Sequence, residues 1–356
     1  MFNLQRLLER LRPKEPIAAN YVLYEDRLFT KKRVSVKHDR IRFIRKHFKK
    51  NAETQLIDLQ GESFYLLLIH VDNIAHFFHD VFFPLYYVWR TNKKRICVSI
   101  DGDRFQQEFL ESVIGKDYLV FLDRNTAYQF SDLILTPEGR DLKIYSDYIP
   151  VCQEIKQICF SRNGITEHRT KNLLYGRNEL SRKNLLDIDP AFLKVNNIEL
   201  VFLSQLSFKD YLQTLATARS FTYMVGAGVF NLLFLDPNVD VLEINPHRNN
   251  SWAQMFGLSQ LCDFRVIVSD RLKPSSAATQ DEAILDSHVY FDERIANAMV
   301  DLITRHNWHY GHTHCNAKSD LFEDHRLCAI GDCRVNFYTA VHGAWMHHNG
   351  IGFSKG

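Results

Sequence analysis

The chain of 356 residues contains little cysteine, glycine or proline, with 7 Cys, 15 Gly and 9 Pro. An odd number of scattered cysteines is not typical of a disulfide-stabilised secreted domain, so we expect a reducing compartment, the cytoplasm. Hydrophobic residues make up 46% and charged residues 24% of the sequence. That composition indicates a folded globular protein and excludes a fibrous or disordered one.

Long apolar runs are also missing. No stretch approaches the roughly 20 apolar residues that a membrane-spanning helix needs. Residues 1–12 alternate leucine with arginine and lack the apolar centre of a signal peptide, so we expect no signal peptide. The length of the chain is sufficient for two domains of ordinary size.

An excess of charge of one sign is absent overall, since 44 Lys and Arg accompany 42 Asp and Glu. A net charge of +2 gives no reason to expect a nucleic-acid partner. Residues 31–50 depart from this balance, because they contain ten Lys or Arg and a single acid. Two interpretations stay open. One is peripheral contact with anionic lipids at a membrane surface, and the other is the solvated edge of β-strands, which Ile41, Phe43 and Ile44 favour.

Short apolar runs alternate with segments of helical periodicity through most of the chain. The apolar runs lie at residues 64–71, 95–100, 118–122, 198–203, 221–225, 239–244 and 264–268. Helical patterns lie between them, at residues 73–91, 104–114, 208–218 and 229–235. This alternation predicts parallel βαβ units. We therefore expect an α/β fold of two Rossmann-like parallel-sheet lobes that face a cleft, with ligands beyond the carboxyl ends of the strands.

Four segments follow from this pattern. We expect an N-terminal α/β lobe over residues 1–150, a C-terminal α/β lobe over 151–272, and a loop with a closing helix over 273–306. The tail, 307–356, is rich in His and Cys and predicts a fragment of a further domain. Its spacing fits no standard zinc site. Around Cys333 it weakly resembles the first block of the GDSL esterases and acyltransferases.

The helical segment at residues 72–91 carries the first constellation of polar residues. At 3.6 residues per turn, Asp72, His76, His79 and Asp80 share one face, directly after a buried strand. Two acids and two imidazoles there could form a general-base relay that takes a proton from an acceptor hydroxyl. The alternative is a capping Asp72 with histidines satisfied by hydrogen bonds in the core.

A basic cluster, Arg177, Arg182 and Lys183, forms the second constellation. Guanidinium groups bind diphosphate oxygens in a bidentate manner and stabilise the charge that grows on a leaving nucleotide. A solvated basic loop is the alternative.

The third constellation is a strand–turn–helix element through Gly226, Ala227 and Gly228. Small residues let the backbone approach a phosphate, and a helix N-terminus presents free N–H groups to it. Glu243 ends the next predicted strand, where an acid can hydrogen-bond a ribose.

In this order the three constellations resemble glycosyltransferase family 61, over about residues 71–268. The first is particularly similar to the protein O-mannose N-acetylglucosaminyltransferase branch, with its Asp-Asn…His…His-Asp…Pro-Leu helix. The second matches part of the family's paired-Arg segment. The third resembles its Gly-Ala-Gly…Asn-Leu-Leu-Phe-Leu element, in which Asn231 falls. The family's His before Gly-Ala is Val225 here, which removes one expected donor contact.

The resemblance implies a GT-B fold, a nucleotide-sugar donor (usually a UDP-sugar), inversion at the anomeric carbon and no metal cofactor. We therefore expect an inverting glycosyltransferase that transfers a sugar to a glycan or polysaccharide. Asp72, with Asp80 or His79, is the expected base, while Arg177, Arg182 and Lys183 hold the donor diphosphate and Glu243 the nucleoside. A catalytically inactive GT-B-like module that binds glycan or nucleotide is the alternative.

One further motif bears on metals. Asp101-Gly102-Asp103 spells the Asp-x-Asp signature of metal-dependent glycosyltransferases, and it follows a predicted strand. Asp-Gly is also a common turn dipeptide. Because the resemblance implies a metal-independent family, we expect a turn and no metal site.

Overall fold

The computed structural model describes residues 21–24, 27–30, 41–51, 53–67, 74–99, 104–123, 125–135, 149–177, 183–246, 251, 253, 258–269, 271–273 and 288–304. The chain divides into two compact units, residues 1–143 and 144–356. The domain boundary that the sequence predicts, 150/151, lies inside a helix of the second unit, α5 (Ile149–Asn163).

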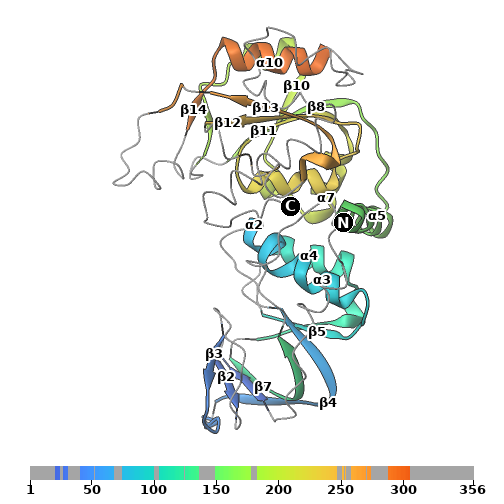
Figure 1. The fold of residues 1–356 in the computed structure, drawn as a ribbon, viewed down its shortest axis with the longest axis vertical. Coiled ribbons are helices and arrows are strands. Elements are labelled where there is room, and N and C mark those ends of the chain that lie inside the picture. The colour runs from blue at the N-terminus through green and yellow to red at the C-terminus, as the bar shows by residue number, and fades with distance from the viewer. Residues whose placement is uncertain are drawn as a thin grey trace, which may run out of the picture. The chain divides into compact units, whose positions relative to one another are not determined.

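The first unit contains one sheet (Figure 1). Its strands are β1 (Tyr21–Tyr24), β2 (Arg27–Thr30), β3 (Arg42–Ile44), β4 (Gln55–Leu67), β5 (Arg95–Val98), β6 (Leu119–Phe121) and β7 (Thr126–Leu135). They lie in the order β3-β2-β1-β7-β4-β5-β6. The central strand β4 runs parallel to β7 and to β5, and β5 runs parallel to β6. This half of the sheet contains the strands that the apolar runs predict.

The other half of this sheet corrects the expectation of an all-parallel lobe. β1 runs antiparallel to β2, from Tyr21 opposite Thr30 to Tyr24 opposite Arg27. It also runs antiparallel to β7, so the sheet is mixed. β1 and β2 are only four residues long, too short for an alternating pattern to stand out in the sequence. The protein is therefore α/β, and its described strands form one mixed sheet and two parallel ones.

The helices of the first unit pack through aromatic rings. A continuous helical stretch consists of α2 (Ile74–His76), the π-helix η1 (Phe77–Phe82) and α3 (Phe83–Trp89). α4 (Arg104–Val113) lies against it. Phe109 of α4 contacts Phe77, Phe78 and Phe82, with ring centroids 5.8, 5.0 and 4.6 Å away. Aromatic pairs at such distances stabilise the packing beyond the area that the rings bury, so this cluster fixes α4 against the helical stretch.

The second unit contains a five-stranded sheet in which every pairing is parallel. Its strands are β8 (Lys171–Tyr175), β10 (Ile198–Val201), β11 (Ala218–Met224), β12 (Asp240–Asn245) and β13 (Asp263–Val268). Their order is β10-β8-β11-β12-β13, so the first strand in the chain lies between the second and the third. A separate short pair joins β9 (Leu185–Leu186) to β14 (Val289–Tyr290).

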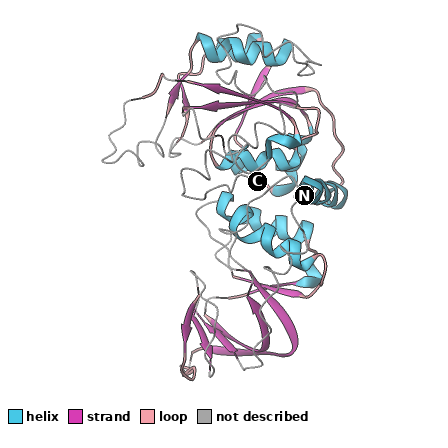
Figure 2. Cartoon of the chain, viewed as in Figure 1, coloured by secondary structure: helices cyan, strands magenta, loops and turns pink. Residues whose placement is uncertain are grey.

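Helices cover both faces of this sheet (Figures 1 and 2). α10 (Glu293–Thr304) packs on β11 and β12, and α6 (Pro190–Val195) packs on β10. On the opposite face, the 3-10 helix η6 (Ala227–Phe234) contacts α5 and α7 (Phe208–Ala216). α10 occupies the place of the predicted closing helix.

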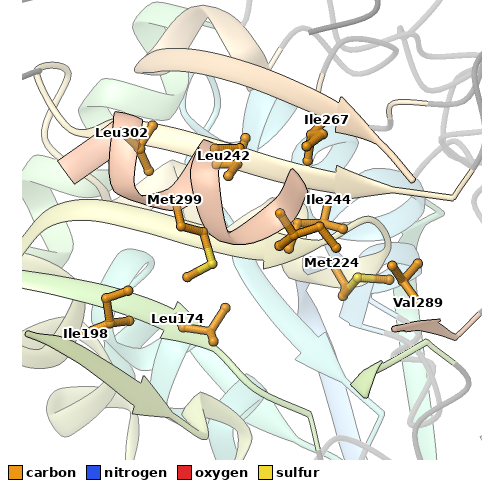
Figure 3. Packing of buried hydrophobic residues seen from close by; sticks show 11 residues of the cluster. Leu174, Ile198, Met224, Leu242, Ile244, Ile267, Val289, Met299 and Leu302 are labelled. Atoms are coloured by element: carbon orange, nitrogen blue, oxygen red, sulfur yellow. The ribbon is translucent and has the colours of Figure 1, made fainter. Parts of the chain in front are cut away.

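The core beneath α10 is built from residues two apart along each strand (Figure 3). Met224 of β11 and Leu242 and Ile244 of β12 point toward Met299 and Leu302 of α10. Because side chains alternate across a strand, their neighbours Tyr223 and Glu243 lie on the opposite face. That alternation directs the polar side chains of the candidate site away from the α10 core.

The basic segment is described from residue 41 onward. β3 is the edge strand of the first sheet. Ile41 is buried in the core of the first unit, whereas Arg42, Arg45 and Lys46 are exposed. This arrangement agrees with the solvated strand edge, one of the two interpretations above; residues 31–40 lie outside the described part.

Two further expectations concern membrane-spanning helices and the state of the cysteines. Among the described residues, no helix is long and apolar enough to cross a membrane. Four cysteines in that part of the chain, Cys97, Cys152, Cys159 and Cys262, are buried free thiols. Burial raises the pKa of the Cys152 thiol to about 12, so this thiol is unreactive near neutral pH.

Candidate functional site

The order of the parallel strands fixes where a ligand site would form. β8 and β11 are neighbours, but the chain leaves them toward opposite faces. After β8 it reaches α6, whose Phe192 and Leu193 join the core beneath α10. After β11 it enters η6, on the face of α5 and α7. In open parallel sheets, ligands occupy the crevice beyond the carboxyl ends of such a strand pair.

A guanidinium group lies at this point. Arg177 follows β8 and Gly226 follows β11. Arg177 Nη2 lies 3.5 Å from the carbonyl oxygen of Met224. A Cβ atom added to Gly226 would lie 2.6 Å from the same nitrogen. Gly226 also has a φ of +137°, a conformation that side chains rarely adopt. Glycine is therefore required at position 226 for two reasons, the backbone conformation and the close approach of Arg177.

The charge of Arg177 is not balanced within the described part of the chain, where no carboxylate lies within 4.0 Å of its guanidinium. Burial lowers the pKa of Arg177, and the nearby hydroxyls of Tyr175 and Tyr223 oppose that shift. A guanidinium nevertheless stays protonated in proteins. Among the described residues, Arg177 is thus a half-buried cation with no acid close enough to neutralise it.

Lys183 and Glu243 supply two more titratable groups, and both are buried. Burial and the positive charge of Arg177 lower the pKa of Lys183 to about 8, against the opposing effect of Glu243. Burial raises the pKa of Glu243 to about 7, against the hydrogen bonds of Tyr223, Ser251 and Asn245 and the charge of Lys183. Tyr223 Oη donates to Glu243 Oε2 at 2.7 Å, and Asn245 Nδ2 donates to Oε1 at 3.1 Å.

The three charged groups do not cancel. Arg177 and Lys183 are two cations near one acid, and that acid is half protonated near pH 7 because its pKa is about 7. Among the described groups, positive charge therefore exceeds negative charge, which favours an anionic ligand. The side chain of Glu243 has no exposed surface and both its oxygens accept hydrogen bonds. Glu243 therefore accepts the hydrogen bond of Tyr223 and interacts with the charge of Lys183. It offers no exposed surface for the predicted contact with a ribose.

The second glycine of the turn admits an aromatic ring. A Cβ atom at Gly228 would lie 2.7 Å from Tyr175 Cε1 and 3.6 Å from Asn231 Nδ2. Asn231 is 7% exposed, and its Oδ1 accepts a hydrogen bond from Tyr211 Oη at 2.8 Å. Its Nδ2 has no hydrogen-bond partner in the structure. Since a buried donor without a partner is costly, Asn231 retains one donor at this turn for an incoming acceptor.

The backbone of the turn is the last component. Ala227 opens η6, whose first N–H groups have no partner one turn earlier in the helix. Val225, directly before Gly226, is 1% exposed and donates its N–H to the carbonyl of Ile244 at 3.0 Å. Its buried aliphatic side chain offers no polar group where the family that the chain resembles has histidine.

The candidate base residues belong to the first unit, and the candidate donor residues belong to the second. His76 is exposed and His79 is half-buried. Asp80 belongs to η1, and nothing is described of its side chain; Asp72 lies outside the described residues. The structure therefore describes two of the four side chains of the stripe.

The helix that carries this stripe is not a regular α-helix. In η1 the N–H of Phe83 donates to the carbonyl of Phe78, five residues earlier. A π-helical turn takes in one more residue than an α-turn, so the face predicted with 3.6 residues per turn is shifted after His76. Phe77, Phe78 and Val81 are nevertheless buried, so the stretch keeps an apolar face.

Other predicted residues fall outside the described part of the chain. These are Arg182, the Asp101-Gly102-Asp103 turn and the tail at 307–356. Where side chains are described, no group of three or more His, Cys, Asp or Glu is arranged to hold a metal ion.

Sequence reasoning missed Tyr175 and Tyr223. They stand opposite each other on neighbouring strands, and Glu243 is the next residue in the same row. β8 went unrecognised because it is a five-residue strand, Lys-Asn-Leu-Leu-Tyr, with a polar start. The signal that could have found it is the Leu-Leu-Tyr-Gly run directly before Arg177.

No protein-family model matches the chain, and no curated protein matches it.

Proposed function

We propose that the second unit binds the diphosphate of a nucleotide sugar, and that the chain is an inverting glycosyltransferase with a UDP-sugar donor. The observation that carries the proposal is the guanidinium of Arg177, which lies against Gly226 between β8 and β11, with no neutralising acid in the described part of the chain. A cation held at the point where a parallel sheet binds ligands favours a phosphate group.

The other residues of the site fit a diphosphate better than a single small anion. Lys183 adds a second cation, and Ala227 and Gly228 add backbone N–H groups at the start of η6. Asn231 adds a buried amide donor. In sugar transfer, negative charge grows on the leaving diphosphate, and fixed positive groups near it lower the barrier. Arg182 belongs to the same proposal through its place in the basic cluster.

The proposed reaction is a single displacement. The oxygen of an acceptor hydroxyl on a glycan or polysaccharide attacks the anomeric carbon and forms the new glycosidic bond. The bond from that carbon to the diphosphate breaks, and UDP leaves with the electron pair. The base takes the acceptor proton, and attack from behind inverts the anomeric carbon. Asp72 is our first choice for this base and Asp80 the second, in a GT-B arrangement of two lobes that face a cleft.

One observation favours a second candidate, a catalytically inactive module that binds nucleotide or glycan. Val225 is buried and apolar, so one polar contact to the donor that the resemblance implies cannot form. Such a module would bind UDP but would release no UDP from a UDP-sugar.

The test compares two arginines at opposite ends of β8. We expect Arg177→Ala to weaken UDP binding by about 10- to 150-fold, because a charge-assisted hydrogen bond contributes about 1.5–3 kcal/mol. Arg169→Ala is the matched control, since Arg169 precedes β8 and lies 3.7 Å from Asp236. Its UDP affinity should equal that of the parent. Calorimetry on the full chain measures both.

Equal UDP affinity in the parent and in Arg177→Ala would remove the donor site from the second unit. UDP release from UDP-sugars, measured on the same preparations, separates the two candidates. Binding with release supports the transferase, and binding without release supports the inactive module.

A further inference from the structure

A tyrosine that belongs to none of the three sequence constellations contacts the candidate site through one amide. Tyr211 of α7 donates its hydroxyl to Oδ1 of Asn231 in η6 at 2.8 Å, and both side chains are buried. The other end of the amide, Nδ2, has no hydrogen-bond partner in the described part of the chain. The acceptor end of this buried amide is therefore occupied, whereas its donor end is not.

Gly228 allows the amide to lie at the start of η6. Residues three apart in a 3-10 helix lie one above the other, and helical side chains lean toward the N-terminus. Asn231 leans over Gly228 in this way, since a Cβ atom on Gly228 would lie 3.6 Å from Nδ2. The same Cβ atom would lie 2.7 Å from Cε1 of Tyr175. Tyr175 is in register with Tyr223 and thereby shares the face of the sheet that carries Glu243, so these contacts place the amide at the turn of the candidate site.

The ring of Tyr211 has a fixed position. It stacks on Phe208, with ring centroids 6.0 Å apart and an angle of 21° between the ring planes. The edge of Phe234 meets it at 82°, with centroids 5.6 Å apart. Because the ring cannot move without disturbing this packing, its hydroxyl holds the amide of Asn231 in one orientation, with Nδ2 over Gly228.

We propose that Tyr211 is a positioning residue of the diphosphate site, which holds Asn231 with its N–H donors toward the turn. The inference rests on the proposed function and adds selectivity to it. Arg177 and Lys183 attract any anion, whereas an amide fixed as a donor suits only a ligand with an acceptor at that point. The oxygens of an ionised diphosphate are acceptors only, so the pair favours this class of ligand.

Calorimetric titration of the full chain tests the pair through a double-mutant cycle. We expect Tyr211→Phe, which keeps the ring and removes the hydroxyl, to weaken UDP binding by about 2- to 10-fold. Asn231→Leu should weaken it by a similar factor. In the Asn231→Leu background, Tyr211→Phe should have no further effect, because it acts through the amide. Inorganic pyrophosphate should show the same pattern, since the amide contacts the diphosphate.

Tyr128→Phe is the matched control. Tyr128 is also a buried tyrosine, and its hydroxyl accepts a hydrogen bond from the N–H of Asp123 at 2.8 Å in the first unit. This variant should have a lower melting temperature than the parent and the same UDP affinity. Loss of a buried hydroxyl alone is thereby separated from loss of the proposed positioning.

Three outcomes would overturn the inference and leave the proposed function standing, provided that Arg177→Ala still loses UDP affinity. Tyr211→Phe could bind UDP as tightly as the parent. It could weaken UDP binding by the same factor with and without the amide of Asn231, which would be an effect of packing. It could weaken UDP binding and leave pyrophosphate binding unchanged, which would place the contact outside the diphosphate. A parent that binds neither UDP nor pyrophosphate would overturn both the inference and the proposed function.

Discussion

The two units place their candidate residues in different ways. In the first unit the polar stripe lies on one helical stretch, within about twenty residues of sequence. In the second unit Arg177 follows β8, Gly226 follows β11 and Glu243 lies within β12, and the sheet brings them together. A site on one helix depends only on the number of residues per turn, whereas a site on a sheet edge depends on the order of the strands.

The difference shows which assumption each prediction needs. The stripe of Asp72, His76, His79 and Asp80 assumes a regular α-helix, and η1 breaks that regularity in its middle. The row at the sheet edge needs no such assumption, because two glycine contacts and the Tyr223–Glu243 hydrogen bond fix it directly. The donor half of the proposal is therefore better supported than the base half.

The largest expected effect tests the first unit. A general base contributes about 10²- to 10⁴-fold in rate. Asp72→Asn or Asp80→Asn should therefore lose turnover by that factor with an unchanged UDP dissociation constant. Turnover, UDP affinity and melting temperature should be measured on the same preparations.

Asp117→Asn provides the matched control, since Asp117 is an exposed acid of the same unit, in a short 3-10 helix (Lys116–Tyr118). If both candidate variants keep full turnover and Asp72→Asn loses only about 1 kcal/mol of stability, Asp72 is a helix cap. The base would then lie at His76, at His79 or outside the helix.

The next prediction tests the buried acid of the second unit through the pH dependence of stability. Burial raises the pKa of Glu243 from 4.5 to about 7. Between those values the unfolded chain releases a proton that the folded chain retains. The stability that Glu243 contributes is thus complete below about pH 4.5 and is lost as pH rises to about 7. Glu243→Gln cannot ionise, so its stability relative to the parent should rise by roughly 3 kcal/mol across that range.

Denaturant unfolding at several pH values measures this difference. Lys183→Met is the companion variant. The pKa of Lys183 is lowered from 10.5 to about 8, so its contribution is complete above about pH 10.5 and is lost as pH falls to about 8. A difference between Glu243→Gln and parent that does not change from pH 4.5 to 7 would contradict the buried acid.

A pair of glycines, one in each unit, gives the third test. Gly226 has a φ of +137° and Gly61 a φ of +99°, so alanine strains the backbone at both by about 1–3 kcal/mol. A Cβ at Gly226 meets Arg177, whereas nothing lies within 4 Å of a Cβ at Gly61. Gly226→Ala should lower stability and weaken UDP binding about tenfold or more, because the guanidinium must move. Gly61→Ala should lower stability alone, and calorimetry separates the two effects.

Much of the fold could be predicted from apolar runs and helical periodicity. The last four residues of β4, the last three of β5 and all of β12 are buried, and the apolar residues of these buried stretches produce the runs. The hairpin of β1 and β2 and the strand β8 could not be predicted in this way. Their four or five residues carry no periodic signal, and pairing with distant β7 or β11 makes them strands.

The candidate site, too, could be predicted from the sequence only in part. Arg177, Lys183 and the glycines of the turn could be chosen from residue chemistry. The row of Tyr175, Tyr223 and Glu243 could not, because it depends on the register between β8, β11 and β12. The burial of Glu243 could not be predicted either, since acids are rarely fully buried.

The smallest expected effect concerns metal. In the proposed reaction, Arg177 and Lys183 would offset the charge of the leaving diphosphate, which is the role of a divalent ion in a metal-dependent enzyme. We therefore expect transfer to persist in excess chelator, and Asp101→Ala and Asp103→Ala to keep the turnover of the parent. Loss of turnover on chelation, with recovery on adding manganese, would assign the Asp-Gly-Asp turn of the first unit to a metal. In that case Arg177→Ala should retain most of its UDP affinity when manganese is present, because the ion would then hold the diphosphate.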